Sequence, residues 1–95
     1  MSTNKNDANK AAVLAALGAV RAALKNEAES PAVARALDQC DRLELAIARF
    51  HAEGLRFAAF TLLRGVQSSG TVLTESVHSS TRDLRAALET AGYPH

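Results

Sequence analysis

The chain has 95 residues, with eleven lysines and arginines against ten aspartates and glutamates, and a single cysteine, Cys40. This length is enough for one domain with a modest core. The balanced charge gives no global field to attract nucleic acid or an anionic membrane, and a lone cysteine excludes an internal disulfide. The polar start, Met1 to Lys10, lacks the apolar stretch of a secretory signal. We therefore expect a cytoplasmic protein.

The first predicted helix covers residues 7–28. Residues 1–6 are expected to form a disordered tail, and Asp7 is a suitable N-cap. The apolar positions recur at helical spacing and form one stripe: Val13, Leu14, Leu17, Val20, Leu24 and Ala28.

The second predicted helix is unusually long, at residues 31–67. Ser30 is a good N-cap, and Pro31 suits the first helical position. Apolar and small residues then keep one helical phase around Ile47, taking about 100° per residue. Gly54 is the natural place for a break, but the charged face keeps its register across it. The pattern predicts one uninterrupted helix in which Gly54 and Thr61 let a neighbouring helix approach closely.

A third helix is predicted at residues 71–91. Gly92 suits its C-cap, Tyr93 can pack back, and Pro94 prevents continuation. Ser80 to Asp83 has the pattern of a capping box that would start a separate helix. Because apolar positions stay in phase across this segment, a continuous helix is the preferred prediction.

The predicted fold is all-α, a single domain over residues 7–95 with three helices in an up-down-up arrangement. The central helix would be about 55 Å long, far longer than its neighbours at about 33 and 31 Å. Much of its apolar stripe would stay uncovered, which indicates an interface. A homodimer is the simplest solution, since one patch then meets itself. The alternatives are a different partner protein, or a compact monomer with the second helix bent.

His51 lies inside the predicted apolar stripe, with Glu44 and Cys40 on nearly the same line of the helix. Inward positions on the other helices could supply hydrogen-bond partners. The resulting candidate buried polar cluster is Arg21, Cys40, Glu44, His51, Ser80 and Thr81. One interpretation is a structural cluster that fixes helix register; the other is a ligand or metal pocket. A spacing of seven between Glu44 and His51 is too long for chelation by one helix. We therefore favour the structural interpretation and predict no metal and no cofactor.

The candidate interface lies along the second helix. Phe50 and Phe57 share the apolar face and are expected in the core or dimer seam. Phe60 falls among the arginines, as an exposed residue or a second interface. The full candidate set is Ile47, Phe50, Gly54, Phe57, Phe60, Thr61 and Leu63.

Five arginines form a stripe on the predicted exposed face: Arg35, Arg42, Arg49, Arg56 and Arg64. Interleaved acids, Asp38, Asp41 and Glu53, argue against nucleic acid as the partner. No spacing suits an acid–base couple or an activated nucleophile. The sequence favours a non-enzymatic adaptor or regulatory protein that acts as a homodimer and offers the arginine-lined face or Phe60 to a partner. The competing hypothesis is a ligand- or metal-responsive protein with its pocket around Glu44 and His51.

Overall fold

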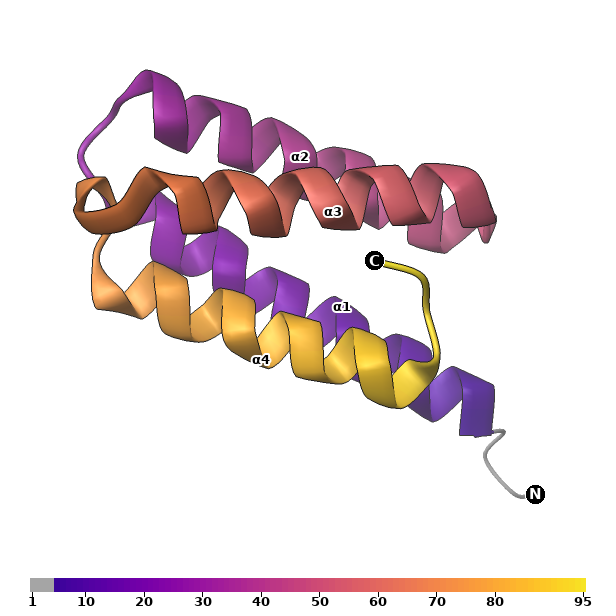
Figure 1. The fold of residues 1–95 in the computed structure, drawn as a ribbon. Helices are drawn as coiled ribbons and strands as arrows, with labels where there is room; N and C mark the ends of the chain where they lie inside the picture. Colours follow the sequence, from indigo (N-terminus) through magenta and orange to yellow (C-terminus); the bar gives the residue numbers. More distant parts are fainter. Residues whose placement is uncertain (1–4) are drawn as a thin grey trace.

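The computed structural model describes residues 5–95, with side chains from Asp7 onward, and this part of the chain is helical without strands (Figure 1). Successive helices run in opposite directions, as an up-down-up-down bundle. The bundle is elongated, with extents of 44 × 23 × 17 Å. Its elements are α1 (Lys5–Lys25), α2 (Pro31–Arg49), α3 (Ala52–Ser69), a short 3₁₀ helix η1 (Gly70–Val72) and α4 (Glu75–Ala91). The all-helical prediction is confirmed.

The long helix predicted at residues 31–67 is wrong: α2 and α3 are separate, antiparallel helices joined by Phe50 and His51. Phe50 adopts the left-handed conformation, with φ 53°. Its N–H donates to the Ile47 carbonyl at 3.2 Å, and the His51 N–H donates to the Ala46 carbonyl at 3.2 Å. These bonds close α2 with the pattern usually made around a glycine.

His51 also begins α3, as its N-cap. Its Nδ1 accepts the Gly54 N–H at 2.9 Å, and its carbonyl accepts the Leu55 N–H at 2.8 Å. Gly54 has a specific role here, because a Cβ at this position would lie 3.0 Å from His51 Nδ1. Gly54 therefore belongs to the start of a helix rather than to the middle of one.

The break also changes which face of α3 is buried. The predicted phase put Gly54, Phe57 and Thr61 inward, whereas the buried face is Leu55, Ala58, Ala59, Leu62, Leu63 and Val66. Two non-helical residues shift the phase, and the larger aliphatic side chains then define the core. The predicted stripe depended on small residues, which contribute little burial energy.

The core lies between all four described helices. Its fully buried large side chains are Val13, Leu17, Val20, Leu24, Leu43, Ile47, Leu55, Leu62, Val66, Val77, Leu84 and Leu88. The first helix differs from the prediction at both ends, because α1 includes Lys5 and ends at Lys25 rather than Ala28. The rest of the predicted tail, residues 1–4, lies outside the described residues.

The α1–α2 connection, at the other end of the bundle, follows the sequence signals. Ser30 Oγ accepts the Val33 N–H at 3.2 Å, ahead of Pro31 at the first position of α2. The Glu27 carboxylate accepts both the N–H and the Oγ–H of Thr74, at 2.9 and 2.8 Å. This pair of bonds ties the α1–α2 connection to the N-terminus of α4.

The last helix begins at Glu75, after η1, rather than at residue 71. It is continuous through residues 78–81, as preferred. Gly92 ends it with φ 72°, and the Tyr93 N–H donates to the Leu88 carbonyl at 2.9 Å. The buried Tyr93 ring meets Phe50 edge to face, with centroids 5.7 Å apart. The C-terminal segment therefore packs back onto the α2–α3 turn.

Across residues 5–95, no helix combines the length and the apolar character that crossing a bilayer requires.

Candidate functional site

The predicted buried polar cluster does not form. Arg21 of α1 binds two carboxylates of α2, Glu44 at 2.9 Å and Asp41 at 3.1 Å, and both carboxylates are exposed. Partial burial opposes the charge on Arg21, but the hydrogen bond and charge of Glu44, together with the hydrogen bond of Asp41, raise the pKa of the guanidinium. This group is an ion pair across the surface of α1 and α2, not a pocket.

Cys40 is fully buried beside that ion pair. Desolvation raises the pKa of its thiol to about 11, against a smaller lowering by Arg21. A thiol with this pKa stays protonated at neutral pH. It is therefore unreactive toward metals and electrophiles, because these react with the thiolate. Cys40 is therefore a small apolar core residue.

The other three members of the predicted cluster lie apart from it. His51 is exposed at the α2–α3 turn, whereas Ser80 and Thr81 donate to carbonyls of their own helix, those of Ser76 and His78, at 2.8 Å. Within the described part of the chain, no group of three or more histidine, cysteine or carboxylate side chains is placed to hold a metal. The helix break separates Glu44 from His51: Glu44 binds Arg21 of α1, whereas the exposed His51 lines a cavity between α2 and α3.

The predicted interface residues divide into three groups by exposure. Ile47 and Leu63 are buried in the core of the bundle, so the prediction of an interface role is wrong for them. Phe50 and Phe57 were expected to be buried, yet 65% and 62% of their surface is exposed. Gly54 and Thr61 are half-buried and face the space between α2 and α3.

All three phenylalanines of the chain are exposed, and all lie in the α2–α3 hairpin. Phe60 is 54% exposed, with the Arg64 guanidinium 5.9 Å from its ring centroid. Leu45 on α2 is also half exposed. Large aromatic side chains are normally buried, so their accumulation on one hairpin marks this surface as different from the rest.

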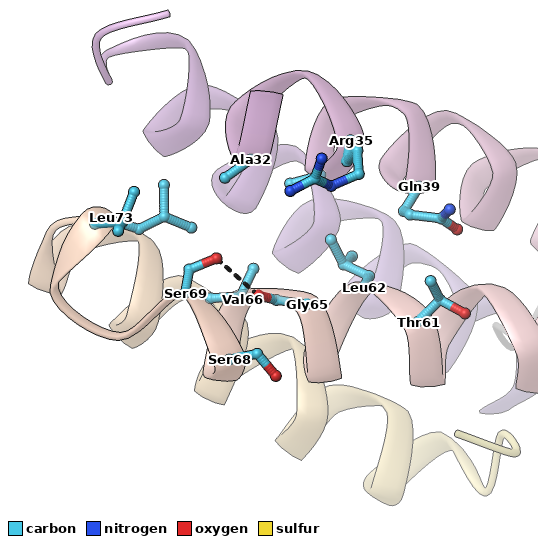
Figure 2. Close-up of a pocket in the computed structure, with 12 residues that line it drawn as sticks. Ala32, Arg35, Gln39, Thr61, Leu62, Gly65, Val66, Ser68, Ser69 and Leu73 are labelled. Carbon is cyan, nitrogen blue, oxygen red and sulfur yellow. Dashed lines mark hydrogen bonds between the residues drawn. The ribbon is translucent and has the colours of Figure 1, made fainter. Parts of the chain in front are cut away.

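Two cavities lie in succession between α2 and α3 and share Gln39. The first, of about 430 Å³, is next to η1; the second, of about 500 Å³, is next to the Phe50–His51 turn. Figure 2 shows Arg35 and Gln39 of α2 across the first cavity from Thr61, Leu62 and Gly65 of α3. Since the two helices are antiparallel, the cavities form one groove along the hairpin, which we call the α2–α3 groove.

Small side chains create this groove. The residues that line it on α3 include Gly54, Ala58, Thr61 and Gly65, and α2 contributes Ala32, Ala36 and Ala46. Little side-chain volume fills the space along the seam of these helices. Larger apolar groups, Leu45 and Phe57, stand at its turn end.

Three arginines of α2 line the groove, Arg35 in the first cavity and Arg42 and Arg49 in the second; we call them the arginine rim. No carboxylate is among the lining residues of either cavity. Two of the α2 carboxylates, Asp41 and Glu44, bind Arg21, and the third, Asp38, binds Arg42 Nε at 2.8 Å. In the described chain, Arg35 and Arg49 form no ion pair. The groove is therefore apolar at its base and positive along one side.

Sequence reasoning found the arginine stripe and Phe60, and all five arginines are exposed as predicted. It missed the groove, Gln39 at its centre and the exposed Val72 at its η1 end. The spacing of seven between Arg35, Arg42 and Arg49 was the available signal. It indicates one side of a groove only once α3 is known to lie beside α2.

Comparison with known proteins gives no relative: no family model, no curated protein and no solved structure matches the chain.

Proposed function

We propose that this chain is a small non-enzymatic interaction protein, an adaptor or regulatory subunit of the cytoplasm, that binds another protein through the outer face of the α2–α3 hairpin. The observation that carries the proposal is the exposure of all three phenylalanines on that hairpin. Phe57 and Phe60 lie one turn apart on α3, and exposed apolar surface is typical of a binding site. Aromatic residues are also the side chains most enriched in the energetic centres of protein interfaces.

The exposed residues are not needed to complete the core. The bundle already buries leucine, isoleucine or valine from each of its four described helices. Phe57 and Phe60 contact water instead, at positions where a charged residue would cost the fold little. A role outside the folded monomer accounts for them better than a role in its stability.

A homodimer is the second candidate. The long uncovered helix no longer supports it, because α3 folds back along α2. What supports it is the same exposed hairpin face, which two copies could bury against each other around a two-fold axis.

The proposal is tested by comparing Phe57→Glu with a matched surface variant, Ala86→Glu on the exposed side of α4. Sedimentation equilibrium measures self-association, and quantitative affinity capture from a native lysate measures association with other proteins. We expect binding by the wild type and by Ala86→Glu, and at least a tenfold loss in Phe57→Glu, as about 1.4 kcal/mol of lost contact would give. Equal behaviour of the three proteins in both measurements would contradict an interaction role for this face.

A further inference from the structure

We infer that the α2–α3 groove receives an amphipathic helix with an acidic flank, supplied by a partner protein. The inference rests on the proposed interaction function and specifies its partner. Three features of the groove carry it: its length, the small apolar residues in its lining and the arginine rim along one side.

The dimensions suit one helix. The α2 residues that line the groove run from Ala32 to Arg49, which corresponds to about 26 Å of helix. A partner helix of about 17 residues would occupy this length. Small residues such as Ala36, Ala58 and Gly65 let its backbone approach closely, with apolar side chains entering the two cavities. Recognition of a helix in a groove uses apolar anchors spaced by three and four residues in this way.

The arginine rim specifies the charge of the partner. Arg35, Arg42 and Arg49 are seven residues apart, so their Cα atoms are spaced by about 10.5 Å along α2. A partner helix that runs roughly along α2 would present carboxylates to them at positions i, i+7 and i+14. Asp38 engages only the Nε of Arg42, and the other two rim arginines have no ion pair within residues 5–95. Complementary charge then selects acidic helices and speeds encounter.

The same charges disfavour a second copy of this chain as the occupant. The groove is lined by Arg35, Arg42 and Arg49 and by no carboxylate, and Asp38 offsets only Arg42. Pairing the groove with itself would bring two surfaces of positive charge together, and like charges facing each other across an interface are costly. The other carboxylates of α2 bind Arg21 on the α1 side and would not relieve the repulsion.

A display selection tests the inference. The library consists of 18-residue helices with apolar residues at heptad positions a, d and e and all other positions randomised. Targets are the wild type, Phe57→Glu, the rim reversal Arg35→Glu/Arg42→Glu/Arg49→Glu, and a control reversal of three arginines that do not line the groove, Arg56, Arg82 and Arg85. Circular dichroism checks that each target is folded.

We expect the wild type to select helices with carboxylates seven residues apart on one flank. Their affinity should fall at least about tenfold in the rim reversal and less than about threefold in the control reversal. The folded rim reversal should itself select basic helices, which a merely unstable variant would not do.

The other outcomes separate this inference from the proposed function. Neutral or basic helices that bind the wild type and lose affinity in Phe57→Glu would overturn the acidic partner and leave the interaction role intact. Failure to enrich any helix, with self-association sensitive to Phe57→Glu, would make a second copy the occupant and overturn only this inference. If the wild type enriches no helix and is monomeric, this inference is overturned. If lysate capture is in addition unchanged by Phe57→Glu, the proposed function is overturned as well.

Discussion

The two helix pairs of this bundle differ in where they place their large side chains. On α1 and α4, large apolar residues such as Leu17, Leu24 and Leu84 are fully buried. Along the outer seam of α2 and α3 the groove has several glycine, alanine and threonine residues in its lining, while Leu45 and Phe57 are exposed to solvent. The α1–α4 pair therefore buries its large apolar side chains in the core, whereas the α2–α3 pair exposes some of its large apolar side chains on the surface.

This difference indicates that the buried core and the outer α2–α3 face have separate roles. Buried leucines contribute to the free energy of unfolding, whereas exposed phenylalanines contribute to it very little. If the outer α2–α3 face serves recognition, stability and binding should respond to separate sets of substitutions.

The largest expected effect is on the core. Leu84→Ala should lower the free energy of unfolding by about 2–5 kcal/mol, because it removes buried methylene groups and leaves a cavity. Phe57→Ala, which removes a larger side chain, should change it by less than about 0.5 kcal/mol. Urea denaturation of both variants measures the contrast. A large loss in Phe57→Ala would mean that the two helix pairs are not divided in this way.

The second prediction concerns pH and the buried face of α2. Burial raises the pKa of the Cys40 thiol from 9.0 to about 11 in the folded protein. The stability that the protonated thiol contributes is therefore complete below pH 9 and is lost as the pH rises toward 11. Over this window the wild type should lose up to about 2–3 kcal/mol more than Cys40→Ala. Parallel urea titrations of the two proteins between pH 8 and 11 measure the difference, and equal losses would contradict a buried thiol.

Parts of this architecture follow from local sequence signals. Ser30 and Pro31 begin α2, because serine is a favoured N-cap and proline suits the first helical position. Gly92 ends α4, because glycine readily adopts the left-handed conformation of a C-cap. The continuity of α4 through Ser80 was predictable, since Val77 and Leu84 keep one phase and both are buried. At these positions local preference and tertiary packing agree.

The α2–α3 turn could not be predicted in the same way, because Phe50 and His51 are not usual cap residues. Phe50 takes a conformation that normally favours glycine, with its ring against Tyr93 from the far end of the chain. His51 caps α3 with a ring nitrogen in place of a serine or aspartate oxygen. Tertiary contact supports a turn that local preference disfavours, and the groove exists only because of that turn. The groove therefore could not be predicted, even though the sequence analysis had named its three arginines and Phe57.

The third prediction tests the left-handed residue at this turn. Phe50→Gly and Phe50→Ala both remove the ring and its contact with Tyr93, but only glycine adopts φ 53° without steric cost. Phe50→Gly should therefore be the more stable of the two, by about 1–2 kcal/mol. Thermal and urea unfolding measure the difference. In an uninterrupted helix the order would reverse, since glycine costs about 1 kcal/mol relative to alanine there.

The smallest expected effect isolates the cap at the start of α3. His51→Ala should cost about 1 kcal/mol, because the Gly54 N–H loses its acceptor at 2.9 Å. His51→Asp should retain most of that stability, since a carboxylate can accept the same bond and favours a helix N-terminus.

Gly54→Ala should be better tolerated in the His51→Ala background than in the wild type, because the added Cβ would otherwise lie 3.0 Å from His51 Nδ1. A double-mutant cycle on these two residues measures the coupling. If the effects were additive and His51→Ala stabilised the protein, residues 50 and 51 would belong to one continuous helix, and the groove built on their turn would not exist.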